Sequence, residues 1–122
     1  MREIKFRVWD KLNKEMFNVE SINFQERRVY RDTVSYREFN DIELMQYTGL
    51  KDKNNKEIYE GDILFESFGE RYYRVIFENG SFRAEFKGNF EEYSFDLIDV
   101  VAQSYEVVGN IYENPELMEE VR

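Results

Sequence analysis

The sequence predicts a mainly β fold: a small barrel or rolled antiparallel sheet built from hairpins, with a short C-terminal helix. Aromatic residues make up 17% of the chain, which excludes a disordered or coiled-coil polypeptide. Apolar and polar residues alternate with a period of two, and turn-forming residues separate these segments at intervals of roughly 8–12 residues. The 122 residues suffice for a single domain. We also consider its subdivision into an N-terminal hairpin over residues 1–40 and a barrel-like part over residues 43–115.

The first third of the chain predicts one hairpin and two shorter strands. Ile4, Phe6 and Val8 alternate with Lys5, Arg7 and Trp9, the pattern of a half-buried strand. A polar turn over residues 10–15 follows, and an apolar segment then returns. The strands expected after this turn cover residues 16–24, 27–34 and 43–47. Residues 36–44 fit no single element.

One short phrase occurs twice in the chain. Residues 52–58 repeat residues 10–16 at six of seven positions when Met16 and Ile58 are counted as equivalent. In each copy an Asp can cap the turn, an Asn suits left-handed backbone, and Lys-Glu leads into an apolar residue. The repeat therefore predicts two hairpin turns of the same type. A weak metal site is a secondary hypothesis for the acidic residues of this region, Asp52, Glu57, Glu60 and Asp62.

The rest of the chain predicts further hairpins and the C-terminal helix. Asn79-Gly80 lies between two alternating segments and is the strongest hairpin signal in the sequence. Asn114 and Pro115 predict the cap and first residue of a helix that continues to Val121. The expected strands cover residues 63–65, 72–77, 81–86, 90–95 and 106–112. Residues 97–104 fit a helix or a strand, and seven to nine short strands are expected in all.

Three blocks of sequence follow one another along the chain: IKFRVWDK at residues 4–11, MQYTGLKDKN with KEIYEGDI at residues 45–63, and VVGNIYENPEL at residues 107–117. With these blocks the chain resembles the YopX-like family of small proteins encoded by phages and prophages, chiefly of Gram-positive bacteria. Asn55 stands where that family often has Gly, so we expect Asn55 to adopt a left-handed conformation. The resemblance implies a β-rich fold and a place inside a phage-infected or lysogenic cell. It implies no activity and transfers no catalytic residue.

Composition excludes several classes of enzyme. The chain contains no Cys and no His, so it can form no disulfide, no Cys-His or Ser-His catalytic pair and no zinc site of the usual kinds. It also has no glycine-rich phosphate-binding loop. We therefore expect a protein that is not an enzyme and binds no cofactor. The N-terminus lacks an apolar signal segment, and no apolar run reaches the roughly 20 residues of a membrane span, so we expect a cytoplasmic location.

The net charge of −9 is distributed unevenly. Residues 1–40 contain nine basic and seven acidic residues, whereas residues 89–122 contain nine acidic residues and one basic residue. Such a chain is repelled by phosphate backbones, so nucleic acid is a disfavoured partner. The acidic end is explained by solubility, by docking to a basic partner, or by self-association with the arginines of the first third.

Two groups of residues are candidate partner-binding sites. The first joins arginines and an aromatic residue, the combination that stacking and backbone contacts to nucleic acids use: Arg27, Arg28, Arg31 and Tyr30. The second is acidic, and its carboxylates would imitate phosphates at about 6.6–6.8 Å along one strand face: Glu91, Glu92, Asp96 and Asp99. The favoured interpretation is a protein-binding or self-assembling β module, because aromatic residues exceed what a core of this size needs. Its partner would be a host factor or a second copy of the chain, and a homo-oligomer is the favoured case. The alternatives are an acidic inhibitor that imitates nucleic acid and a small-barrel nucleic-acid binder.

Overall fold

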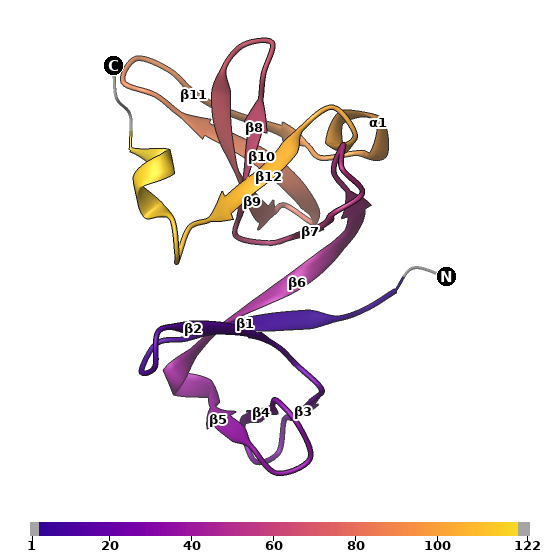
Figure 1. Ribbon diagram of the computed structural model, residues 1–122, viewed down its shortest axis with the longest axis vertical. Coiled ribbons are helices and arrows are strands. Elements are labelled where there is room, and N and C mark those ends of the chain that lie inside the picture. Colours follow the sequence, from indigo (N-terminus) through magenta and orange to yellow (C-terminus); the bar gives the residue numbers. More distant parts are fainter. Residues whose placement is uncertain (1–2, 120–122) are drawn as a thin grey trace. The chain divides into compact units, whose positions relative to one another are not determined.

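The computed structural model describes residues 3–119 and is mainly β, as the sequence predicts (Figure 1). Short antiparallel hairpins dominate, in agreement with the period-two alternation of apolar residues. The strands are β1 (Phe6–Asp10), β2 (Glu15–Asn18), β3 (Ser21–Asn23), β4 (Arg28–Tyr30), β5 (Tyr36–Glu38), β6 (Ile42–Lys51), β7 (Glu57–Tyr59), β8 (Asp62–Glu66), β9 (Arg71–Glu78), β10 (Ser81–Lys87), β11 (Glu92–Asp96) and β12 (Glu106–Asn110). The helical elements are η1 (Phe39–Asp41), α1 (Asp99–Ala102) and η2 (Pro115–Met118).

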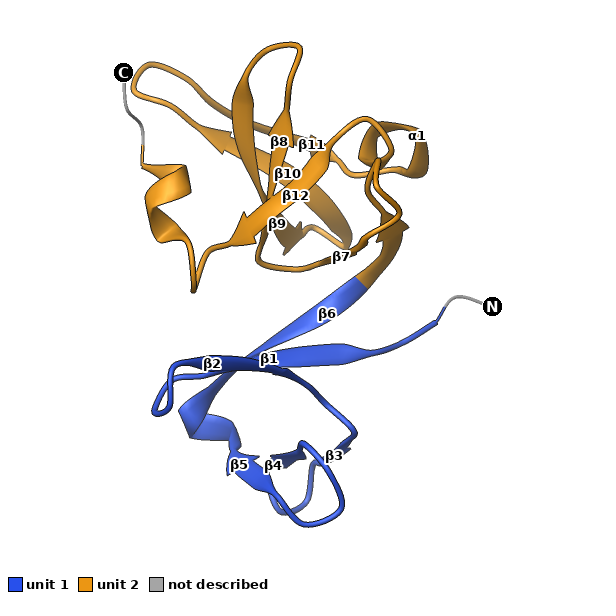
Figure 2. Ribbon diagram, viewed as in Figure 1, with its two compact units in different colours: residues 1–47 blue, residues 48–122 orange. Residues whose placement is uncertain are grey.

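The chain forms two compact units, Met1–Tyr47 (unit 1) and Thr48–Arg122 (unit 2), coloured separately in Figure 2. The boundary falls inside β6. The predicted subdivision between residues 40 and 43 stays a prediction.

Unit 1 contains two small antiparallel sheets. In one, β1 pairs with β2 and with the first half of β6; in the other, β4 lies between β3 and β5. Its core consists of the buried side chains of Val8, Phe17, Val29 and Ile42, with three half-buried apolar residues packed against them. The period-two alternation in β1 places Val8 in this core.

Unit 2 is built on a curled five-stranded antiparallel sheet in the order β11-β10-β9-β8-β12. Its core includes Leu64, Tyr73, Val75 and Ala84 from three neighbouring strands. Because β8, β9, β10 and β11 follow one another as hairpins, the β8–β9 and β10–β11 loops lie at the same end of the sheet, opposite the β9–β10 turn (Figure 1). This arrangement determines which loops can act together.

Two backbone predictions are confirmed. Asn79 and Gly80 both have positive φ angles, 55° and 83°, as a two-residue hairpin turn requires. Asn55 has a φ of 67°, which is the expected left-handed conformation. The expected total of seven to nine strands is wrong, because twelve strands lie within residues 3–119.

One strand prediction fails because the chain changes sheets. The sequence predicts a single strand over residues 16–24, but the structure has β2 and β3 there. The backbone N–H of Val19 still donates to Phe6 of β1, whereas the next N–H, of Glu20, donates to Tyr30 of β4. Alternation of apolar residues is the same on both sides of such a switch, so it does not reveal the break. The unassigned residues 36–44 contain β5, η1 and the start of β6, and residues 97–104 contain α1.

The C-terminal helix is shorter than expected. Only a 3₁₀ turn, η2, forms at Pro115, and Asn114 does not cap it with its side chain. The Asn114 Oδ1 atom accepts a hydrogen bond from the Asn110 backbone instead, at 3.2 Å. Val121, the predicted end of the helix, lies outside the described residues.

The two repeated turns share a capping Asp but differ in detail, so the prediction of one turn type is wrong. In the first turn the N–H of Lys14, with a φ of 58°, closes the turn on the carbonyl of Asp10. In the second, Asn55 closes the turn on the carbonyl of Asp52, one residue earlier in the repeat. In each turn the left-handed residue is therefore the one whose N–H closes the turn.

Candidate functional site

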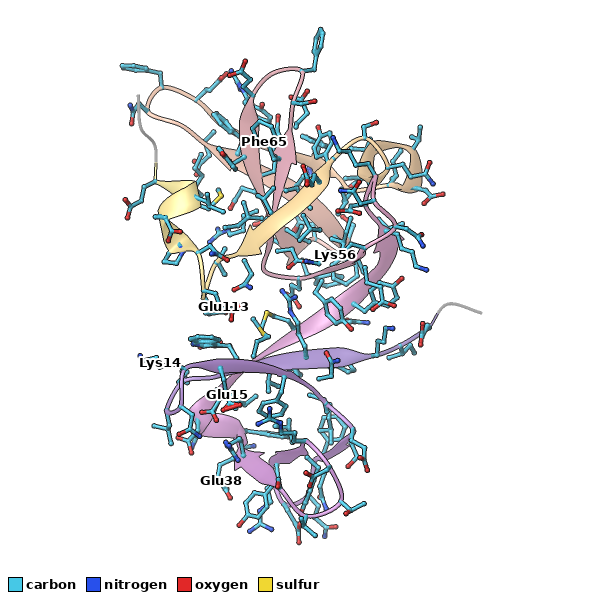
Figure 3. All side chains as sticks on the ribbon, in the orientation of Figure 1. Lys14, Glu15, Glu38, Lys56, Phe65 and Glu113 are labelled. Atoms are coloured by element: carbon cyan, nitrogen blue, oxygen red, sulfur yellow. The ribbon has the colours of Figure 1, made fainter. Side chains whose placement is uncertain are left out.

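The predicted arginine stretch folds onto acidic residues of its own unit. Arg28 donates through Nε to Glu38 at 3.3 Å, and Arg31 donates through Nη1 to Glu15 at 2.7 Å. Glu15 and Glu38, both labelled in Figure 3, come from β2 and β5, so the fold brings distant carboxylates to these cations. The positive charge that the sequence groups together is thus largely balanced within unit 1.

Aromatic rings hold the same cations in place. The guanidinium of Arg28 lies 4.1 Å from the ring centroid of Tyr36, and that of Arg31 lies 4.9 Å from the ring of Phe17. Arg27 lies 5.4 Å from the ring of Phe39. The Tyr30 ring packs against the Tyr36 ring at 5.6 Å. The three arginine contacts are intramolecular cation–π interactions, and a nucleic acid would have to replace them.

The neighbouring Arg37 supports a buried turn rather than a ligand. Its Nε donates to Oδ2 of Asp10, which is fully buried and also accepts from Asn13 and from the backbone of Leu12. Burial alone raises the pKa of Asp10, but the hydrogen bonds from Arg37, Asn13 and Leu12 outweigh it and lower the pKa to about 2. Asp10 is therefore a structural carboxylate.

The residues of the secondary metal hypothesis also serve turns. The Asp52 carboxylate accepts backbone hydrogen bonds from Asn54, Lys56 and Val107 at 2.8–2.9 Å. Asp62 accepts one from the backbone of Tyr59 at 2.8 Å. Within residues 3–119, no three acidic side chains are grouped so that they could hold a metal ion.

The four acidic candidates do not form one row of carboxylates. Glu92 and Asp96 lie on β11, whereas Glu91 precedes that strand and Asp99 begins α1. Three of the four have cationic partners: Glu91 pairs with Arg71 at 2.8 Å, Glu92 with Lys87 at 3.6 Å and Asp96 with Arg83 at 2.6 Å. The β10–β11 surface is therefore a ladder of mixed charge.

A surface that the sequence predictions missed lies at the end of the unit 2 sheet. Phe68 in the β8–β9 loop and Phe90 in the β10–β11 loop are both 100% exposed. The first loop is closed by the Glu66 carboxylate, whose two oxygens accept from the Gly69 N–H at 2.9 and 2.8 Å. The second is closed by the N–H of Gly88, which donates to the carbonyl of Glu91 at 2.8 Å. Both tips are therefore internally hydrogen-bonded and present a phenyl ring to solvent. We call residues 67–70 and 88–91 the hairpin end.

A groove of about 520 Å³ adjoins the hairpin end. It lies between the adjoining ends of β9 and β10 and the 3₁₀ turn η2, and residues 69–72, 86–87 and 116–119 line it. Its apolar side chains are those of Tyr72, Phe86, Leu117 and Met118. The guanidinium of Arg71 lies 4.4 Å from the Phe86 ring and donates to the Tyr93 hydroxyl at 2.8 Å. The groove therefore offers apolar contacts beside fixed charges, a composition suited to a protein segment.

Comparison with known proteins identifies the family. The family model described as YopX protein matches residues 5–119. The chain belongs to the YopX protein family.

Solved structures with a similar fold exist. Protein EF1440 from Enterococcus faecalis has a TM-score of 0.73 and 30% sequence identity, over 98% of this chain and 100% of that one. The yopX protein from Bacillus subtilis has a TM-score of 0.60 and 22% identity, with both chains covered completely. No curated protein sequence matches this YopX-family chain. The predicted family resemblance is confirmed, and it assigns no catalytic residue. Within residues 3–119, the structure has no helix with the length and apolar character to cross a membrane.

Proposed function

We propose that this YopX-family chain is a non-enzymatic protein-binding module of a phage or prophage. It acts in the cytoplasm of the bacterial host, and the hairpin end of unit 2 is its contact surface. The observation that carries the proposal is the complete exposure of Phe68 and Phe90 on two loops at one end of a sheet.

Exposed phenyl rings at this position favour binding over a purely structural role. Burying one Phe side chain contributes about 1.5–3 kcal/mol, so two rings would supply a large share of a typical protein interaction. Neither ring contributes to the core of unit 2, which is formed by other residues. The adjacent groove adds room for side chains of the partner.

The two alternative functions receive less support. An acidic inhibitor that imitates nucleic acid needs unpaired carboxylates, but Glu91, Glu92 and Asp96 form ion pairs with basic residues. A nucleic-acid binder needs available cations, but Arg28 and Arg31 form ion pairs with acidic residues of unit 1. The absence of His and Cys from the sequence also favours a binding protein over an enzyme.

The test is an affinity purification of the tagged chain from host lysate, with and without nuclease, analysed by mass spectrometry. A protein partner that survives nuclease and is lost in a Phe68→Ser/Phe90→Ser double variant is the expected result. Phe24→Ser is the matched control, because Phe24 is 74% exposed in unit 1. Partners that disappear with nuclease, or partners that the double variant retains, would contradict the proposal. So would turnover of a substrate by the purified chain that a point variant abolishes.

A further inference from the structure

Acidic residues surround both exposed rings of the hairpin end. Phe68 lies between Glu66 and Glu70 in the sequence, and Phe90 is followed by Glu91 and Glu92. The η2 side of the groove adds Glu116 and Glu119. Together, residues 66–72, 86–92 and 115–119 contain six acidic and two basic residues. The contact surface is therefore apolar at its tips and negative around them.

The two basic residues of these segments do not cancel the negative charge. Arg71 pairs with Glu91, and Lys87 pairs with Glu92, both through contacts within the unit. The remaining acidic side chains include the exposed Glu70 and Glu116 on either side of the groove. A cationic group placed over the groove meets a net negative field.

This charge argues against a second copy as the occupant. The sequence of unit 1 contains nine basic and nine acidic residues, so it is formally neutral, and unit 2 carries the whole net charge of −9. Two hairpin ends facing each other would repel. Arg28 and Arg31 of unit 1, two of the cations with which a second copy could pair, already form ion pairs with Glu38 and Glu15. An anionic membrane surface is disfavoured for the same electrostatic reason.

We infer that the hairpin end binds a basic segment of a partner protein that carries at least one large apolar or aromatic side chain. The inference rests on the proposed protein-binding function and specifies the chemistry of the partner. The apolar side chain of the segment enters the groove beside Tyr72, Phe86 and Met118. Lys or Arg residues of the segment lie near Glu70 and Glu116, while Phe68 and Phe90 contact the partner on the outer side.

The experiment is a selection from a library of displayed random peptides on the immobilised full chain, with counter-selection on Phe68→Ser/Phe90→Ser. The inference expects enriched peptides with net positive charge and a large apolar residue. Their affinity should fall about tenfold or more in a Glu70→Lys/Glu116→Lys variant, because like charges then face each other. The control is Glu78→Lys/Glu20→Lys, which changes the net charge equally at exposed positions away from the groove.

Several outcomes would overturn the inference. These are enrichment of acidic or uncharged peptides, no enrichment over the double Phe variant, or equal losses of affinity in the two charge-reversal variants. Two further measurements address the other occupants. Phe68-dependent dimerisation in sedimentation velocity would assign the surface to a second copy, and Phe68-dependent sedimentation with phosphatidylcholine vesicles, with or without phosphatidylglycerol, would assign it to a lipid surface.

The inference and the proposed function can fail separately. If the lysate partner depends on Phe68 and Phe90 but the selected peptides are not basic, the partner chemistry is wrong and the binding function stands. If neither partner capture from lysate nor peptide enrichment depends on Phe68 and Phe90, the inference and the proposed function are both wrong.

Discussion

Unit 1 is formally neutral, whereas unit 2 carries the entire net charge of −9. In unit 1 the arginines that the sequence groups together lie over aromatic rings and beside carboxylates of the same unit. In unit 2 acidic residues surround two fully exposed phenyl rings, neither of which belongs to the core of the unit. The comparison shows that charged and aromatic residues clustered in the sequence can be paired within their own unit, while two single aromatic residues in turns are left fully exposed.

The aromatic residues of unit 2 show the same contrast on a smaller scale. Tyr73 lies at the centre of the core, with the rings of Tyr105 and Phe95 each 5.4 Å from its own. Burial, together with a hydrogen bond to Tyr93, raises the pKa of Tyr73 well above its ordinary value. The Tyr73 ring is thus fixed in the core, whereas the rings of Phe68 and Phe90 in the loops are fully exposed.

The largest expected effect is the loss of unfolding free energy when a buried capping Asp is removed, compared with the loss when an exposed one is removed. Asp52→Ala removes the acceptor of three backbone N–H groups, one of them on Val107 of β12, and should lower the free energy of unfolding by about 3 kcal/mol or more. Asp32 also accepts two backbone hydrogen bonds, from Val34 and Ser35, but it is exposed in unit 1. Chemical denaturation should show a far smaller loss for Asp32→Ala. Equal losses of unfolding free energy in the two variants would show that burial of the Asp does not determine the size of the loss.

The second prediction concerns acid unfolding of unit 1. The pKa of Asp10 is about 2 in the folded chain, below the ordinary 3.8, so the ionised carboxylate stabilises the fold above pH 3.8. This stabilisation should be lost as the pH falls from 3.8 towards 2. The fluorescence of Trp9, the single Trp of the chain and the neighbour of Asp10, reports the transition.

Asp10→Asn should remove much of this pH dependence, and Glu20→Gln serves as a control for the loss of one acidic charge. An acid transition of Trp9 that is the same in wild type and in Asp10→Asn would contradict the assignment.

The third prediction concerns the exposed edge of the unit 2 sheet. Arg83 on β10 reaches across to the edge strand β11, where Nη1 contacts Asp96 and Nη2 donates to the Ser94 carbonyl at 3.0 Å. Arg83→Ala should cost about 1 kcal/mol and free an edge carbonyl that can pair with another chain. Sedimentation velocity should show weak self-association.

Arg74→Ala is the matched control for Arg83→Ala. It breaks the ion pair with Glu85, but β9 and β10 lie inside the sheet rather than at its edge. Self-association of both variants would assign the effect to lost charge rather than to the strand edge.

The smallest effect is expected for an exposed ion pair of unit 1. Arg31 and Glu15 are 2.7 Å apart, with side chains 43% and 39% exposed. Solvent screens such a pair, so Glu15→Gln should change the free energy of unfolding by about 0.5 kcal/mol or less in chemical denaturation. A loss of several times this size would mean that the arginine contacts carry the stability of unit 1.

The fold class and the strongest turns follow from local rules. Alternation and the Asn79-Gly80 dipeptide depend on neighbouring residues only, and both are confirmed. The left-handed Asn55, expected from the family resemblance, is also confirmed, but the matching Asn13 of the other turn is not left-handed. The break between β2 and β3 depends on a change of hydrogen-bonding partner from Phe6 to Tyr30, which no local pattern encodes.

The candidate site shows the same limit. Arg31 and Glu15 are separated by 16 residues, so the sequence does not reveal that the arginine is paired. A signal for the hairpin end did exist, because Phe68 and Phe90 each stand beside turn-forming residues between two strands. Their joint exposure depends on the order of the hairpins, which becomes visible only when the sheet is assembled.

The measurement that tests this account most directly is hydrogen–deuterium exchange of the full chain, alone and with the partner protein recovered from lysate. The account predicts slower exchange at residues 67–72, 86–92 and 115–119 of unit 2 and unchanged exchange at residues 21–38 of unit 1. Protection confined to residues 21–38 would instead assign partner binding to the arginines and contradict the account.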